Sequence, residues 1–134
     1  MNRYVFLLSI VYILVSCKSS PVQTKISSCD SLIIDFKYPD TDSIIHTVVA
    51  TDKKAIRRLG DFMNGKEVSN IRCGHDGNMR FYSDGVMVLP VVFEFKKDSC
   101  RQFLFDLDGK TINTNMSKEA ADFLQSLEDG KSEY

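Results

Sequence analysis

Residues 73–107 read CGHDGNMRFYSDGVMVLPVVFEFKKDSCRQFLFDL, and this stretch decides the fold. Short runs rich in β-branched and aromatic residues are separated by two turn signals, Ser83-Asp84-Gly85 and residues 96–99. This punctuation is typical of an antiparallel β-meander. In the last run Phe103, Phe105 and Leu107 share one face while Gln102 and Asp106 lie on the other, which predicts a sheet with one buried face and one solvated face.

Two residues of the run 86–95 interrupt this pattern. Pro90 cannot donate a ladder hydrogen bond, so it predicts a bulge or an edge position, and we interpret the irregularity as a bend. Glu94 lies among apolar residues, where a carboxyl can have a perturbed pKa. Alternation with Phe93 and Phe95 instead predicts that Glu94 lies on the solvated face.

Helical periodicity and β-branched content extend the prediction to the rest of the chain. The predicted amphipathic helices are 53–64 and 117–127. Further strands are predicted at 31–38, 44–51, 110–115 and, for a short strand, within 68–71. The whole pattern predicts an α+β domain, with an antiparallel β-meander sheet and two amphipathic helices packed on one face.

The charge composition argues against one class of partner. The chain has 134 residues, with 17 basic and 18 acidic side chains and a net charge of -1. No cluster of Lys or Arg is dense enough to follow a phosphate backbone, so nucleic acid is not an expected partner. The length suits one domain.

The N-terminus has the features of an export signal. Arg3 precedes an apolar run at 4–15, and Leu14-Val15-Ser16-Cys17 closes it. As a helix, about a dozen residues span roughly 18 Å, which is short of the roughly 30 Å of membrane hydrocarbon. The segment is therefore predicted to be a cleaved signal peptide rather than a transmembrane anchor.

The four residues Leu14-Val15-Ser16-Cys17 resemble the lipobox of bacterial lipoproteins. The resemblance implies that the thiol of Cys17 receives a lipid, that cleavage occurs before it, and that Cys17 becomes the first residue of the mature protein. Lys18, in place of Asp after the lipidated position, implies the outer membrane by the same resemblance. The alternative is an ordinary secreted protein that is cut near a cysteine.

These signals predict four segments along the chain. Residues 1–16 are a lipoprotein signal peptide, 17–30 a lipidated Cys with a flexible tether, 31–130 one α+β domain, and 131–134 a C-terminal tail. The tether is predicted because residues 18–31 are rich in Ser and show no apolar periodicity.

An exported chain lies in an oxidising compartment, which changes the meaning of its cysteines. Up-and-down strands bring Cys73 and Cys100 together, so a disulfide between them is predicted. Cys29 is then left free or pairs with another chain.

The rival interpretation is a thiol or metal site built from Cys73, His75, Asp76 and Cys100. Zinc sites normally show spaced cysteine pairs, and this pattern has only a Cys-x-His, so no metal or cofactor is predicted. His75 and Asp76 remain possible binding residues.

Motifs of hydrolytic chemistry are missing from the sequence: it has no Gly-x-Ser-x-Gly, no His-Glu-x-x-His and no glycine-rich phosphate loop. We therefore expect a lipid-anchored envelope protein facing the periplasm, with a small non-catalytic domain that binds a protein or envelope component. The alternative is a thiol-redox or metal-dependent periplasmic enzyme that uses Cys73, His75 and Cys100.

Overall fold

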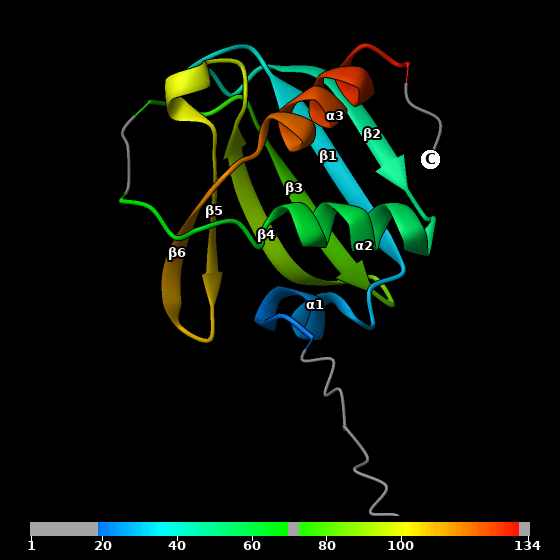
Figure 1. Ribbon diagram of the computed structural model, residues 1–134. Helices are drawn as coiled ribbons and strands as arrows, with labels where there is room; N and C mark the ends of the chain where they lie inside the picture. Colours follow the sequence, from blue (N-terminus) through cyan, green and yellow to red (C-terminus); the bar gives the residue numbers. More distant parts are fainter. Residues whose placement is uncertain (1–18, 70–72, 132–134) are drawn as a thin grey trace, which may run out of the picture.

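The computed structural model describes residues 19–69 and 73–131 (Figure 1). A six-stranded antiparallel sheet, in the order β2-β1-β3-β4-β5-β6, forms its centre. The strands are β1 (Ser31–Lys37), β2 (Ile44–Ala50), β3 (Gly77–Ser83), β4 (Val86–Glu94), β5 (Gln102–Leu107) and β6 (Lys110–Asn115). The helices are α1 (Pro21–Ile26), α2 (Lys53–Phe62), α3 (Lys118–Glu128) and the short 3-10 helix η1 (Asp98–Cys100).

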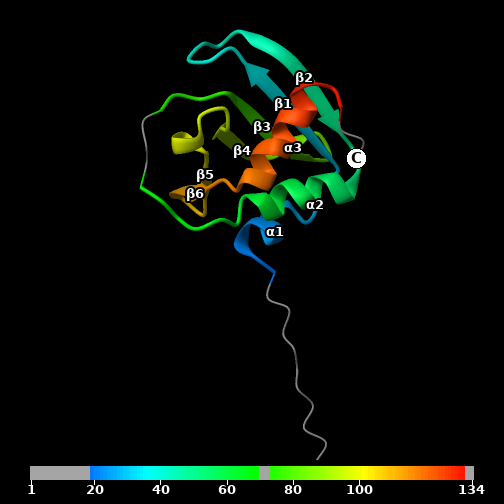
Figure 2. The ribbon, with the colours of Figure 1, turned by 45° about the horizontal axis from the view of Figure 1, so that its top comes forward.

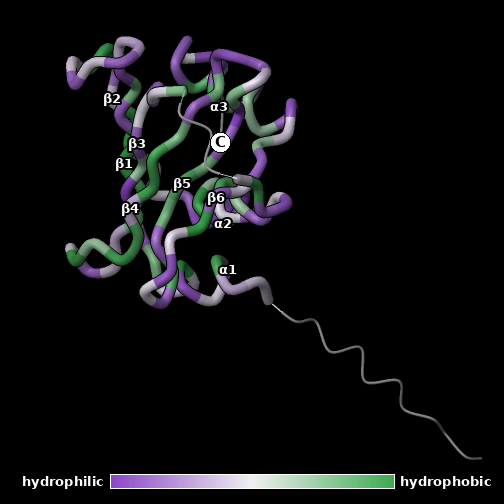
Figure 3. The backbone as a smooth tube through the Cα atoms, turned by 90° about the vertical axis from the view of Figure 1, so that its left-hand side faces the viewer, coloured by the Kyte–Doolittle hydropathy of each residue, from purple (hydrophilic) through white to green (hydrophobic). Residues whose placement is uncertain are grey.

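The predicted fold class is confirmed: the protein is α+β, with an antiparallel sheet and its α-helices on one face. Figures 1 and 2 show α2 and α3 in front of the sheet, with α1 below α2 at one end of the domain. In Figure 3, β1 to β4 stand on one side of the molecule and α2 and α3 on the other. The sheet therefore has an inner face under the helices and an outer face over which no helix of residues 19–69 and 73–131 lies.

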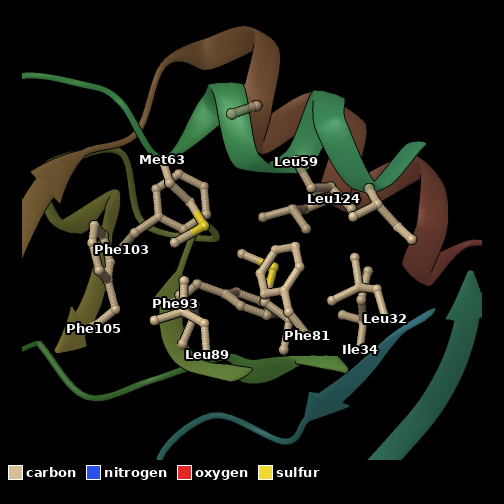
Figure 4. Packing of buried hydrophobic residues seen from close by; sticks show 14 of the residues in the cluster. Leu32, Ile34, Leu59, Met63, Phe81, Leu89, Phe93, Phe103, Phe105 and Leu124 are labelled. Atoms are coloured by element: carbon tan, nitrogen blue, oxygen red, sulfur yellow. The ribbon is translucent and has the colours of Figure 1, made fainter. Parts of the chain in front are cut away.

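The core fills the space between the inner face and the helices (Figure 4). Leu32 and Phe81 rise from the sheet, and Leu59, Met63 and Leu124 descend from α2 and α3, all fully buried. Alternation explains this set, because successive strand residues point to opposite faces. Every second residue of β1, β3 and β5 is an aliphatic or aromatic side chain.

Local signals fix the turns and the helix starts. Asp84-Gly85 and Asp108-Gly109 have positive φ at both residues, as a tight hairpin turn requires. The side chain of Asp52 accepts a hydrogen bond from the Lys54 N–H at 2.7 Å and caps α2. Ser117 caps α3 in the same way through the Ala120 N–H at 3.1 Å.

The first helix corrects the prediction of a flexible tether for the described part of residues 17–30; residues 17 and 18 lie outside the described residues. Ser20 caps α1 and Pro21 starts it, while Val22 and Ile26 are buried against the core together with Cys29. These three residues are spaced i, i+4 and i+7, which is the spacing of residues on one face of a helix. The domain therefore begins about ten residues earlier than predicted, and three α-helices cover the sheet.

Close packing of α1 on α2 depends on a glycine. A Cβ on Gly60 would overlap the Cδ1 atom of Ile26. Gln23 Nε2 also donates from α1 to the Arg57 carbonyl oxygen and to Asp61 Oδ1, both at 2.7 Å. Gly60 is thus the residue that lets the two helices meet.

The short strand predicted within 68–71 is seen only at its start. Glu67 forms an isolated bridge with Thr114, and the Val68 N–H donates to the Asn113 carbonyl oxygen at 2.9 Å. Residues 70–72 lie outside the described part of the chain.

The irregularity predicted near Pro90 has two parts. Tyr82 pairs with Met87 and Phe81 with Leu89, so Val88 is the unmatched residue of a bulge. Pro90 itself pairs with β3, and the pairing between β4 and β5 begins only at the next residue. Pro90 therefore marks the point where β5 separates from β4.

Candidate functional site

The outer face of the sheet has a buried charge at its centre. Asp35 of β1 is only 6% exposed, although no helix covers this face. Thr47 of β2 donates its hydroxyl to Asp35 Oδ1 at 2.7 Å, and Arg80 of β3 donates from Nη2 to Oδ2 at 2.6 Å. Both carboxylate oxygens are thus paired, as a buried charge requires.

Two polar atoms beside this ion pair lack partners. Asn78 Oδ1 and Arg80 Nε are buried atoms that have no hydrogen-bond partner in the described structure. Both residues lie on β3, with side chains on the outer face next to Asp35. One atom is an acceptor and the other a donor, so a ligand that offers both functions would satisfy them.

A hollow of about 530 Å³ lies next to these atoms. It opens where the β5–β6 hairpin bends away from β4, a divergence visible in Figure 1. Outer-face residues make up most of its lining, among them Met87, Pro90 and Val92, and the inner-face residues Met79, Val91 and Phe105 also contribute. Its size lies within the range of ligand sites, which is roughly 300–1,000 Å³.

Hydrogen-bond alternation explains the gap. The Asp30 N–H donates to the Tyr82 carbonyl oxygen, so Tyr82 and every second residue of β3 bond to the β1 side. The intervening residues of β3 bond to β4, and Pro90, which lies opposite Arg80, turns its nitrogen towards β5. A ladder bond is missing there, and β5 leaves the sheet at the same level.

Exposed apolar side chains surround the hollow and the ion pair. Met87 and Val92 of β4 are 49% and 39% exposed, and Val49 of β2 is 59% exposed. Register places all three on the outer face. Apolar side chains around a partly buried Arg, here Arg80 at 34% side-chain exposure, are typical of a protein-binding surface.

A second hollow, of about 470 Å³, lies between α1 and α2. Its lining is mixed: Gln23, Lys53 and Arg57 contribute polar groups, and Ile26 and Ile56 contribute apolar ones. The described chain starts at this hollow, on the way towards Cys17.

The cysteine pair predicted from the sequence is a disulfide in the structure. Cys73 and Cys100 are bonded, with their Cα atoms 5.9 Å apart. The bond links the segment before β3 to η1, at the end of the sheet remote from α1. Cys29 is the free cysteine of the described residues, and it is buried. Burial, with the nearby charge of Asp30, raises the pKa of the Cys29 thiol.

His75 and Asp76 are neighbours in sequence but have different surroundings. Asp76 is buried, and its Oδ2 accepts hydrogen bonds from the N–H groups of Phe95 and Lys96, both at 2.9 Å. This carboxylate therefore holds the end of β4 in place. The Nε2 atom of His75 lies 3.9 Å from Asp42 Oδ1 in a half-exposed position. Over 19–69 and 73–131, no three His, Cys, Asp or Glu side chains are grouped to hold a metal ion.

Glu94 overturns the prediction of a solvated side chain. It is 3% exposed, and its Oε2 atom has no hydrogen-bond partner in the described structure. Burial raises the pKa of the Glu94 carboxyl, and the charges of Asp76 and Asp40 raise it further against the opposing charge of Lys97. Alternation alone was not sufficient for this prediction, because the segments around Asp40 and Asp76 lie close to Glu94 at this end of the sheet.

The outer-face residues Asp35, Asn78 and Arg80 were not predicted as a site. Each alternates with large apolar residues in its strand, which is a visible signal in the sequence. Their meeting depends on β1 lying between β2 and β3, and this strand order requires long-range pairing that local patterns do not encode.

The predicted lipidation site Cys17 lies outside the described residues. Within 19–69 and 73–131, no helix is long and apolar enough to span a bilayer. No family model, no curated protein and no solved structure matches this chain.

Proposed function

We propose that this chain is a lipid-anchored bacterial envelope protein, attached through Cys17, whose domain binds a protein or envelope component without catalysing a reaction.

 The outer face of the sheet is the proposed binding surface. The supporting observations are the lipobox resemblance of Leu14-Val15-Ser16-Cys17, the Cys73–Cys100 disulfide, and the outer face itself.

One observation carries the binding proposal. The outer face combines a hollow of about 530 Å³ with two buried polar atoms, Asn78 Oδ1 and Arg80 Nε, that lack partners in the described structure. A buried polar atom without a partner costs about 1–3 kcal/mol. A bound partner that supplies one donor and one acceptor recovers that free energy, while Met87 and Val92 provide apolar contact area.

The proposed location is the periplasmic side of the outer membrane. It rests on the lipobox and on Lys18, and the disulfide agrees with an oxidising compartment. One acyl chain binds a membrane only marginally, whereas two or three chains give stable attachment. Lipidation of Cys17 would therefore keep the domain permanently at the membrane.

Metabolic labelling with a fatty-acid analogue tests the anchor. Wild type and Cys29→Ser are expected to incorporate the label, and Cys17→Ser is expected to lose it. Cys29 is the matched control because it is a second cysteine outside the disulfide. Equal labelling of wild type and Cys17→Ser would refute the lipoprotein proposal.

Site-specific photo-crosslinking in intact cells tests the binding surface. A photoreactive amino acid at Met87, on the outer face, is expected to capture one reproducible envelope partner. The same amino acid at Lys54, exposed on α2 in the helix layer, is the control and is expected to capture none of it. Capture of the same partner from both positions, or from Lys54 alone, would contradict the assignment of the outer face.

A thiol-redox or metal-dependent enzyme using Cys73, His75 and Cys100 is the competing function. The test uses the double variant Cys73→Ser/Cys100→Ser at a temperature where the domain remains folded. If the partner binds through the outer face, the photoreactive amino acid at Met87 still captures it in this variant. Loss of capture with the fold intact, measured by circular dichroism, would favour the competing function.

A further inference from the structure

The free edge of β2 is the least protected part of the sheet. β2 lies at the end of the strand order and pairs with β1 alone. Ile44, Ile45 and Val49 are exposed large apolar residues on this strand. At the opposite end, the segment at Lys66 and Val68 partly covers the edge strand β6. The Asn115 N–H donates to the Lys66 carbonyl oxygen, and the Val68 N–H donates to the Asn113 carbonyl oxygen.

The backbone of β2 offers hydrogen-bonding groups along this edge. The Tyr38 N–H donates to the Ser43 carbonyl oxygen at 3.0 Å, so Tyr38 and every second residue of β1 bond towards β2. Phe36 is one of these residues, and its partner is His46. The alternate residues of β2, Thr47 and Val49, therefore direct their N–H and C=O groups away from β1, to the open edge.

Features that normally protect an edge strand are missing from β2. Its sequence, IIHTVVA, contains no Lys, Arg, Asp, Glu or Pro. Natural edge strands usually carry such residues, because an exposed apolar edge pairs with other strands. The bulge opposite Phe36 and Lys37 affects only the first residues, so the part from His46 to Ala50 runs regularly.

We propose that β2 pairs with β2 of a second copy of this chain, antiparallel and centred on Thr47. The strand is self-complementary about this residue. Thr47 of each copy exchanges two N–H···O bonds with Thr47 of the other, and Val49 of one copy lies opposite Ile45 of the other. Thr–Thr and aliphatic pairs are both favourable cross-strand neighbours.

The choice of a second copy follows from charge and symmetry. An antiparallel pair of these identical strands brings no acidic or basic side chains against their own copies, because β2 contains no Lys, Arg, Asp or Glu. The two-fold axis lies perpendicular to the sheet, so the helix layers of both copies stay on the same side. This pairing goes beyond the proposed function and does not depend on lipidation or on the outer-face partner.

Cysteine crosslinking of the purified full-length chain tests the register. A hydrogen-bonded antiparallel pair has Cα atoms about 5.5 Å apart, which suits a disulfide. Thr47→Cys is expected to form a covalent dimer under mild oxidation on a non-reducing gel. Thr111→Cys is the matched control, because Thr111 is also an exposed threonine on an edge strand whose hydroxyl donates to an Asp on the next strand, at 2.6 Å.

Sedimentation equilibrium in density-matched detergent tests the assembly itself. Wild type is expected at twice the monomer mass, and Val49→Lys at the mass of one chain, because pairing would force the lysine charge against the apolar Ile45 of the other copy. Met87→Lys, on the same face but on β4, is expected to remain dimeric.

Two results would overturn the proposal. The first is a monomeric wild type together with no disulfide in Thr47→Cys. The second is a dimer that Val49→Lys leaves intact, or that crosslinks through Thr111→Cys instead of Thr47→Cys. Neither result bears on partner capture from Met87, so failure of the β2 pairing and failure of the proposed function are distinguishable.

Discussion

Truncation of Ile26 tests whether α1 belongs to the domain. Ile26 is 3% exposed and packs against α2 close to Gly60. Ile26→Ala removes three carbon atoms, which at about 0.8 kcal/mol each amounts to about 2.4 kcal/mol of lost burial. The cavity left behind adds to this, so we expect the free energy of unfolding to fall by about 2.5–4 kcal/mol.

Urea denaturation followed by far-UV circular dichroism measures this loss. Lys25→Ala is the matched control, since Lys25 lies next to Ile26 on the exposed side of α1. A surface substitution of this kind is expected to change the free energy of unfolding by less than about 0.5 kcal/mol. If Ile26→Ala changes stability no more than Lys25→Ala does, α1 is not packed on the domain, and a flexible tether is the better description.

Three further predictions concern buried and bonded side chains. Burial raises the pKa of Glu94, so the folded state favours the neutral carboxyl. The stability that the neutral carboxyl contributes is fully present below the unfolded pKa of about 4.3, and it is lost as the pH rises through the folded pKa. Glu94→Gln should therefore unfold at higher urea than wild type at pH 7, with the difference vanishing at pH 3; a constant difference would contradict the buried charge. The double variant Cys73→Ser/Cys100→Ser should lose about 3–4 kcal/mol in the same assay, because the disulfide closes a loop with a sequence separation of 27 residues. Cys29 should react with a thiol reagent in Cys17→Ser only after denaturation, since it is buried with a raised pKa; rapid reaction of the native chain would show an open structure around α1.

Local patterns were sufficient for most of the fold. The tight turns at Asp84-Gly85 and Asp108-Gly109, the capping residues Asp52 and Ser117, and the alternation in β5 all act within a few residues of sequence. Interactions of this range can be recognised without knowing what lies elsewhere in the chain. The antiparallel sheet and its two longer helices were predicted for this reason.

The remaining features depend on contacts between distant segments. Val22, Ile26 and Cys29 give too few apolar positions to distinguish a short helix from a polar tether, and only the groove at Gly60 makes that helix stable. The Asp35–Arg80 pair joins residues 45 positions apart. Neither feature can be predicted without the strand order.

Docking of α1 also determines how the domain meets the membrane if Cys17 carries the lipid, as proposed. Ser20 caps a helix that is packed on α2, and only three peptide links separate Ser20 from Cys17. Three extended residues reach at most about 11 Å, so the lipid holds the domain close to the headgroups. Because α1 lies at the lower end of the domain below α2 (Figure 2), this short link would bring that end to the membrane and leave the outer face of the sheet accessible. A partner that binds around Arg80 and Met87 can then approach from the periplasm without displacing the domain from the bilayer.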